Sequence, residues 1–176
     1  LTLMKTSADS LKKSADALND SSLWEKKKIK KKDEKTGEEI AVEDYDWDKI
    51  TKAVKSFVED YNDVVKEAGE SNTKDVLRNA SWMTGMTDKN SNMLAKIGIT
   101  IGKGNKLELD EDALKQADIS SLKTIFTGYN SFVSKISQKA TGISNAANRA
   151  SATYTNNGTY SKTDSLLTSS KIDEEV

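Results

Sequence analysis

Residues 46–69, DWDKITKAVKSFVEDYNDVVKEAG, carry the clearest periodicity in the chain. Their apolar residues recur in steps of three and four, which places them on one stripe of an α-helix. Asp46 or Asp48 can cap the start of this helix, and Gly69 can end it. The stretch therefore predicts a long helix whose stripe packs against other helices, and hence a mainly α protein. The stripe consists of Trp47, Ile50, Val54, Phe57, Tyr61, Val64 and Ala68, widened by Val58 and Val65.

Helical periodicity also marks both ends of the chain. Residues 1–20 place Met4, Ala8, Leu11, Ala15 and Leu18 in a 4-3-4-3 seam, the spacing of a coiled coil. A helix this narrow and alanine-rich is not stable alone. A second stripe predicts one long helix over 120–153, also alanine-rich in its second half, and we expect residues 1–20 to pack on 136–155. Its apolar residues are Ile125, Tyr129, Phe132, Ile136, Ala140, Ile143, Ala147, Ala150 and Tyr154.

A further helical stretch covers residues 73–96, where Gly85 and the polar 87–92 predict a break in the middle. Two β-hairpins separate the helices. Residues 35–37, Lys-Thr-Gly, form a good turn because Gly37 tolerates positive φ. We expect strands near 23–32, rich in lysine, and 38–45, rich in acid, joined by cross-strand charge pairs.

The phrase LAKIGITIGKGNKLELDEDALKQ, residues 94–116, is the strongest candidate for a ligand loop. The glycine and lysine spacing fits neither a P-loop nor the dinucleotide-binding pattern. Its acids lack the alternation and the final glutamate of a calcium-binding EF-hand. The phrase instead predicts a hairpin near 97–109 with a GKGN turn, followed by a short helix over 110–117 that Asp110 caps.

Composition excludes most kinds of catalytic site. The chain has no Cys and no His, so thiolate and imidazole metal sites, cysteine nucleophiles and histidine-based triads are excluded. Carboxylate pairs such as Asp110 with Asp112, or Asp44 with Asp46, fit helix capping better than acid–base chemistry. With a net charge of −1 and no long apolar run, we expect no enzyme, cofactor, metal, small-molecule substrate, nucleic acid or membrane insertion. The first residue is Leu, which suggests a processed or excised chain, and no signal peptide is visible.

Two surface features have competing interpretations. The lysine run could bind phosphate or lipid headgroups, but the acids that follow favour a solvated hairpin that neutralises itself. Trp24 and Trp82 are each either core residues or exposed interface anchors. The lysines are Lys26, Lys27, Lys28, Lys30, Lys31 and Lys32, and the acids are Asp33, Glu34, Glu38, Glu39, Glu43 and Asp44.

Three phrases, together covering about residues 47–135, resemble the flagellar filament-capping, hook-associated (FliD-like) family in family order. We call the 94–116 phrase the first. The second, AVKSFVEDYNDVV, precedes it in the chain, and the third, LKTIFTGYNSF, follows it. The family carries large head domains ahead of the second phrase, whereas here about 46 residues stand there. The resemblance therefore implies the family's helical leg region only. The residues that match are Leu94, Ile97, Gly98, Ile99, Thr100, Lys106, Leu107, Leu109, Asp110, Glu111 and Leu114; Val54, Lys55, Phe57, Val58, Tyr61 and Asn62; and Leu122, Ile125, Phe126 and Gly128.

The expected fold is mainly α, an elongated antiparallel helical bundle or coiled coil with one or two small hairpins. Residues 1–155 would form a single helical domain and 156–176 a flexible tail. The resemblance implies a structural, non-enzymatic subunit at the cell surface or flagellum, exported without a cleavable signal peptide. It would pack with copies of itself or with flagellar or surface subunits, in flagellin assembly or adhesion. The alternative is a stand-alone helical module that binds a surface, a polyanion or a protein. Candidate interface residues are Trp24, Trp82, Leu11, Leu18, Ile143 and Ala147.

Overall fold

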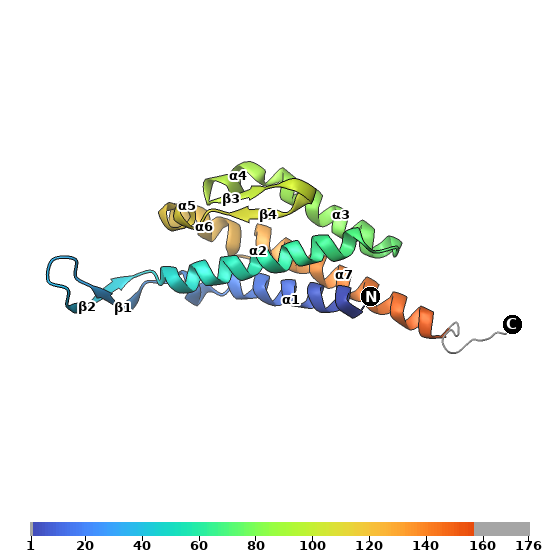
Figure 1. Cartoon of the computed structure of the whole chain (residues 1–176), viewed down its shortest axis with the longest axis horizontal. Helices are drawn as coiled ribbons and strands as arrows, with labels where there is room; N and C mark the ends of the chain where they lie inside the picture. Colours follow the sequence, from blue (N-terminus) through green and yellow to red (C-terminus); the bar gives the residue numbers. More distant parts are fainter. Residues whose placement is uncertain (1, 157–176) are drawn as a thin grey trace, which may run out of the picture.

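A computed structural model describes residues 2–156 of the chain, so the predicted tail lies almost entirely outside the described residues. The described part is elongated and mainly helical, with two small antiparallel strand pairs (Figure 1). The prediction of a mainly α fold with two hairpins is therefore confirmed.

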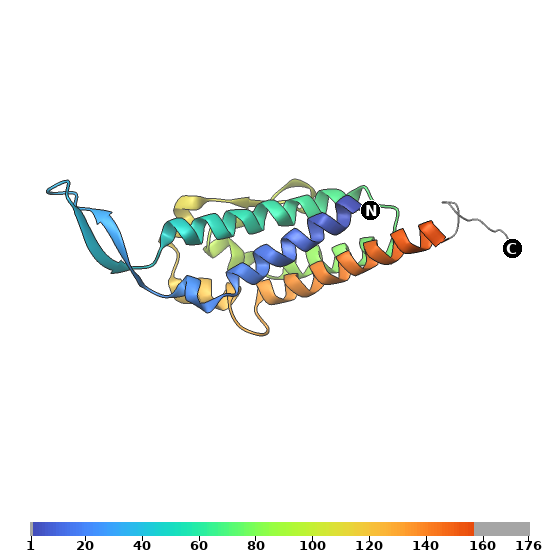
Figure 2. The same cartoon turned by 90° about the horizontal axis from the view of Figure 1, so that it is seen from below.

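Three long helices form the body of the molecule: α1 (Thr2–Leu18), α2 (Trp47–Gly69) and α7 (Phe132–Asn156). They lie side by side in both views (Figures 1 and 2). Helix α1 runs antiparallel to α7, because Ser137 donates a hydrogen bond to Asp16 while Ser144, two turns further along α7, donates one to Asp9. The predicted packing of the two ends of the chain is confirmed.

The remaining elements complete the fold around these helices. The hairpin β1–β2 projects from one end of the body, whereas β3–β4 lies along it (Figure 1). In chain order the elements are the 3₁₀ turn η1 (Ser21–Trp24), β1 (Lys27–Lys32), β2 (Glu39–Asp44), α3 (Lys74–Lys89), α4 (Ser91–Lys96), β3 (Ile99–Ile101), the 3₁₀ turn η2 (Lys103–Asn105), β4 (Leu107–Leu109), α5 (Glu111–Gln116) and α6 (Ile119–Phe126).

The stripe of α2 forms the centre of the core, as its periodicity predicts. Its caps are also as predicted: Asp46 accepts a hydrogen bond from the Lys49 backbone, and the helix ends at Gly69. Burying one such apolar side chain is worth about 1.5–3 kcal/mol, so this stripe supplies much of the driving force for folding. The buried apolar residues of α2 are Ile50, Val54, Phe57, Val58, Tyr61, Val64 and Ala68, while Trp47 is partly buried against the same core.

The predicted strand near 23–32 begins too early. Residues 21–24 form η1, and β1 starts only at Lys27. Asp20 caps the turn by accepting a hydrogen bond from the Ser22 backbone. The Trp24 indole then donates to the carbonyl of Leu18 at 2.7 Å, which folds this segment back onto the end of α1.

The break predicted within 73–96 is present, but it does not lie at Gly85. Helix α3 continues through Gly85 to Lys89, and the chain leaves helical geometry at Asn90 before α4 begins. A Cβ added at Gly85 would meet nothing within 4 Å, so this position does not require glycine for lack of space. The interruption instead falls inside the polar 87–92 segment.

The single long helix predicted over 120–153 is wrong. Helix α6 ends at Phe126, Thr127 is extended, and α7 begins at Phe132. Gly128 adopts a φ of 103°, outside helical geometry. Tyr129, predicted to lie on the apolar stripe, is 82% exposed in the connection.

Candidate functional site

The second family-like phrase, in α2, holds the small hairpin β3–β4 through one asparagine. The Asn62 side chain donates to the Leu107 carbonyl at 2.9 Å and accepts from the Leu107 backbone N–H at 2.7 Å. The amide thus pairs with β4 as a neighbouring strand would, which satisfies a backbone donor and acceptor that would otherwise be unpaired. Asn62 links the second phrase to the first.

The first phrase, residues 94–116, is a hairpin joined to a capped helix, as its sequence predicts. Ile99 pairs with Leu109 and Ile101 with Leu107. Asp110 accepts a hydrogen bond from the Ala113 backbone, which caps α5, and its own N–H donates to the Gly98 carbonyl at 2.8 Å. The inward side chains of this phrase belong to the core: Leu94, Ile97, Ile99, Leu107 and Leu114 are buried, and Leu109 is partly buried against them.

Tyr61, in the second phrase, connects α2 to α3. Its hydroxyl donates to Thr87 Oγ1 at 2.8 Å, and the Thr87 hydroxyl donates in turn to the Met83 carbonyl at 3.0 Å. Burial raises the pKa of Tyr61 to about 12, although the hydrogen bond with Thr87 acts in the opposite direction. The phenol therefore stays protonated at neutral pH and serves as a buried structural donor.

The third phrase, at the end of α6, is held by a second asparagine. The Asn19 side chain accepts from the Gly128 backbone N–H at 2.9 Å and donates to its carbonyl at 3.3 Å. This contact fixes the break between α6 and α7. The sequence analysis did not single out Asn19. The signal that could have indicated it is its position directly after Leu18, the last apolar residue of the seam in residues 1–20.

Of the two interpretations of Trp24, the core residue is correct and the exposed interface anchor is wrong. Its side chain is 1% exposed. Its ring stacks on Phe126 with centroids 5.6 Å apart, and Phe126 in turn meets Phe57 edge to face. Trp24 therefore closes the end of the core, because its indole N–H has found a backbone acceptor at Leu18.

The four helical interface candidates also belong to the chain's own core. Leu11, Leu18, Ile143 and Ala147 are at most 1% exposed, since α1, α2 and α7 cover them. The expectation that these seams contact another subunit is wrong for the fold described, because one chain supplies both halves of the seam.

Hydrogen bonds along the rim of the α1–α7 seam favour ionised carboxylates. A hydrogen bond from Lys5, supported by one from Ser144, lowers the pKa of Asp9. Burial opposes ionisation of Asp16, but hydrogen bonds from Lys12 and Ser137 outweigh it and lower the pKa of Asp16. Each aspartate therefore joins a lysine of its own helix to a serine of α7, which fixes the register of the seam.

Trp82, the other tryptophan candidate, lies on the surface of α3 and is 53% exposed. The Lys139 ammonium of α7 sits 4.8 Å from the centroid of its ring. A cation over the face of an indole holds the ring in place by electrostatic attraction. Trp82 is thus an oriented aromatic surface next to a positive charge.

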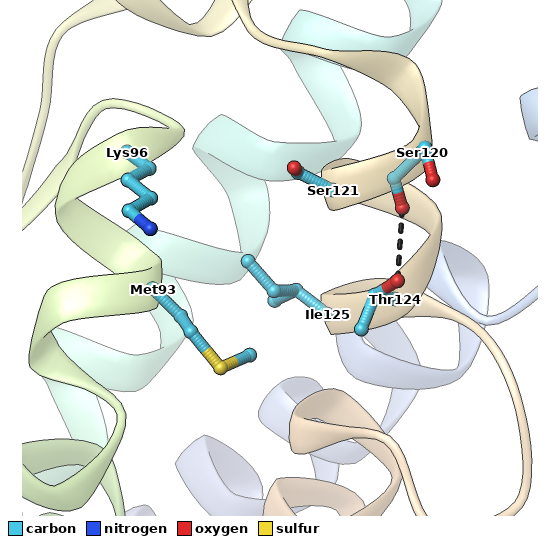
Figure 3. A pocket seen from close by; sticks show the side chains of 6 residues that line it. All are labelled: Met93, Lys96, Ser120, Ser121, Thr124 and Ile125. Atoms are coloured by element: carbon cyan, nitrogen blue, oxygen red, sulfur yellow. Dashed lines mark hydrogen bonds between the residues drawn. The ribbon is translucent and has the colours of Figure 1, made fainter.

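A shallow groove lies between α4 and α6. Figure 3 shows Met93 and Lys96 of α4 opposite the α6 side chains, with Ile125 between them. Ser120, Ser121 and Thr124 add hydroxyls, but the Thr124 hydroxyl is already donated to the Ser120 carbonyl at 2.9 Å. Met93 and Ile125 give the groove an apolar wall, and Lys96 adds a positive charge beside it.

The lysine run lies on the projecting hairpin. Strand β1 pairs with β2 so that lysines stand opposite acids at Lys27–Asp44, Lys28–Glu43 and Lys32–Glu39. One ion pair, between Lys31 and Asp44, is formed. The predicted cross-strand charge pairing is therefore confirmed for that pair.

Within residues 2–156, no group of three or more acidic side chains is placed to hold a metal ion. No helix in the same range is long and apolar enough to cross a membrane.

Comparison with known proteins places part of the chain in a known family. The family model for the flagellar hook-associated protein 2 C-terminus matches residues 69–174. That span includes the first and third family-like phrases, while α1, the β1–β2 hairpin and nearly all of α2 precede it. No curated protein and no solved structure matches the chain.

Proposed function

The chain belongs to the flagellar hook-associated protein 2 C-terminal family, and from this premise we propose that it is a non-enzymatic structural subunit of a flagellar filament cap. It acts outside the cell, at the flagellum or cell surface. Its partners are flagellin, copies of itself and other flagellar or surface subunits. It needs no cofactor.

The observation that supports this proposal is where the family-like residues lie. Asn62, Gly98 and Asp110 make the hydrogen bonds that join β3–β4 to α2 and α5. Residues that only hold a scaffold together fit a protein whose function is to present surfaces. An enzyme would need some of these polar groups to converge on a substrate.

The face presented by α3 is the best contact for another subunit. Trp82 combines a large exposed ring with a neighbouring cation, and tryptophan is enriched among residues that dominate binding energy at interfaces. We propose that Trp82 packs against a helix of flagellin, so that assembly is helix-mediated. The α1–α7 seam acts as a short antiparallel coiled coil that supports this face.

Co-sedimentation with polymerised flagellin tests the proposal. The wild-type chain should pellet with filaments, and Trp82→Ala should weaken binding by about tenfold or more, as expected for a central aromatic contact. Tyr129→Ala is the matched control, because Tyr129 is exposed in a different part of the surface. The cap proposal fails if the wild-type chain binds neither flagellin nor filaments.

A stand-alone helical binding module, in adhesion for example, is the second candidate. The lysine-rich strand β1 favours it, because a polyanion or an anionic surface would be attracted there. Binding to heparin or anionic vesicles that falls steeply with added salt would support this alternative.

A further inference from the structure

The projecting hairpin has no covering layer. Strands β1 and β2 form a sheet of two strands, so within residues 2–156 both are edge strands. The hairpin extends away from the helices in both views (Figures 1 and 2). An isolated hairpin is only marginally stable in water, and each edge offers unpaired backbone donors and acceptors to another strand.

The two edges carry opposite charge. Strand β1 reads KKIKKK and contains no acid, whereas β2 reads EIAVED and contains no base. Lysines can protect β1 from a second lysine-rich edge, but they offer no such protection to β2. Pairing β1 with β1, or β2 with β2, places like charges together, which is unfavourable. Pairing β2 with the β1 of another copy places opposite charges together.

The apolar side chains of the hairpin also lie on one face. Opposed residues in an antiparallel pair share a face, so Ile29 and Val42 lie together, with Ile40 next to Val42 on the same strand face. The Ile40 side chain is 43% exposed, although isoleucine is usually buried. A neighbouring hairpin in the same orientation would extend this apolar row and cover part of it.

From these observations we propose that the β1–β2 hairpin is a head-to-tail self-assembly element, in which the β2 edge of one copy pairs with the β1 edge of a second copy of this chain. The inference rests on the proposed assembly role and names its self-contact. If neighbouring hairpins repeat the internal register, Glu39 meets Lys32, and Glu43 meets Lys28, of the next copy. Contacts of this kind are heterologous, so they close a ring or extend a filament rather than end at a dimer.

Cysteine cross-linking tests the contact directly, because the chain has no cysteine of its own. Lys30 and Ala41 are exposed and stand opposite each other in the middle of the hairpin. Full-length Lys30→Cys and Ala41→Cys variants are mixed and oxidised. Neighbouring strands bring opposed Cα atoms within disulfide range, so the mixed product should dominate. Dominance of either homodimer would overturn the proposal.

A charge-reversal variant tests the contact between copies while keeping the charge pairs within each hairpin. The variant Lys28→Glu/Lys32→Glu/Glu39→Lys/Glu43→Lys retains opposite charges across its own hairpin. It should associate with itself as the wild type does, but not with the wild type, because mixed contacts would oppose like charges. Light scattering with increasing protein concentration, at low and high salt, follows the self-association. Free mixing of wild type and reversed variant would overturn the proposal.

The two proposals can fail separately. If the wild-type chain pellets with flagellin filaments but remains monomeric and yields no mixed cross-link, the hairpin proposal alone fails. If the hairpins cross-link as expected but filaments do not bind the chain, the cap proposal alone fails.

Discussion

The two hairpins share a topology but depend on different forces. Both are antiparallel pairs of adjacent strands. In β3–β4 the inward side chains Ile99 and Leu107 are at most 3% exposed, and Asn62 of α2 continues the backbone pairing. In β1–β2 the strands project from the body and most of their residues are exposed. Three-residue strands thus suffice when a core and a side-chain amide complete them, whereas six-residue strands outside the core depend on charge and turn geometry.

The largest expected difference between the hairpins lies in their glycines. Both Gly98 and Gly37 have positive φ, but a Cβ on Gly98 would lie 2.6 Å from the Asp110 carbonyl oxygen, while one on Gly37 would meet nothing within 4 Å. Gly98→Ala should cost about 4 kcal/mol or more, because backbone strain and a backbone clash add. Gly37→Ala should cost about 1–2 kcal/mol of strain alone, and only locally. Urea denaturation of both variants gives the comparison, and equal losses would contradict it.

Removing the side-chain amide next to β4 should have the second largest effect. Asn62→Ala leaves the N–H and C=O of Leu107 without their partners, which should cost about 2–3 kcal/mol. Asn19→Ala removes the same pair of hydrogen bonds from Gly128, but in an exposed position where water can replace them, so about 1 kcal/mol or less is expected. Thermal unfolding of the two variants distinguishes them. If Asn62→Ala is as mild as Asn19→Ala, then Asn62 does not stabilise β3–β4.

Removing one methyl group from an isoleucine of each hairpin compares how tightly the two hairpins are packed. Ile99 is fully buried, so Ile99→Val should destabilise the protein by about 1 kcal/mol. Ile40 is 43% exposed, so Ile40→Val should change the stability of the isolated chain by no more than about 0.5 kcal/mol. Chemical denaturation at low protein concentration is the appropriate measurement, because self-association would add stability to the Ile40 site. A larger effect at Ile40 than at Ile99 under those conditions would contradict the burial difference.

Among the differences between the two hairpins, the response to acid should be the smallest. A hydrogen bond from Lys31, and then one from the Tyr45 backbone, lowers the pKa of Asp44 below its ordinary 3.8. Because the pKa of Asp44 is lower in the folded state, its contact with Lys31 stabilises the hairpin at pH values above 3.8. This contribution is lost as the pH falls below about 4, and for an exposed pair it is under about 1 kcal/mol. NMR amide shifts of β1–β2 should respond to acid, and Asp44→Asn should remove the Asp44 contribution to that response. An unchanged response in Asp44→Asn would assign it to another group.

The sequence predicts most of the helical framework because periodicity reports burial directly. The stripe of α2, the seam of α1 and the Asp110 cap each follow from spacing or from one side chain next to its own backbone. Both hairpins were also predictable, since their turn residues and alternating patterns are local. For the same reason the family resemblance could be read from short phrases.

The predictions that were wrong concern residues whose conformation or burial depends on parts of the chain far away in sequence. The spacing of apolar residues across 120–153 is compatible with one helix. The hydrogen bonds of Asn19 with the Gly128 backbone instead fix that residue in a non-helical conformation. The sequence could not decide between core and surface for Trp24, because nothing near it in sequence indicates that Phe126 lies beneath its ring. Leu11, Leu18, Ile143 and Ala147 were interface candidates, but the α1–α7 seam that was itself predicted from the sequence covers them within one chain.

By itself, the sequence determined most of the helical segments, the acids that cap α2 and α5, and the apolar face of the long helices, since these depend on interactions within a few residues. Only the tertiary structure decided what each face meets. It buried Trp24, ended α6 at Phe126 and left Trp82, Ile40 and the two charged edges of β1–β2 exposed. Burial depends on the packing of residues more than one hundred positions apart, as in the contact of Asp9 with Ser144, and no local pattern carries that information.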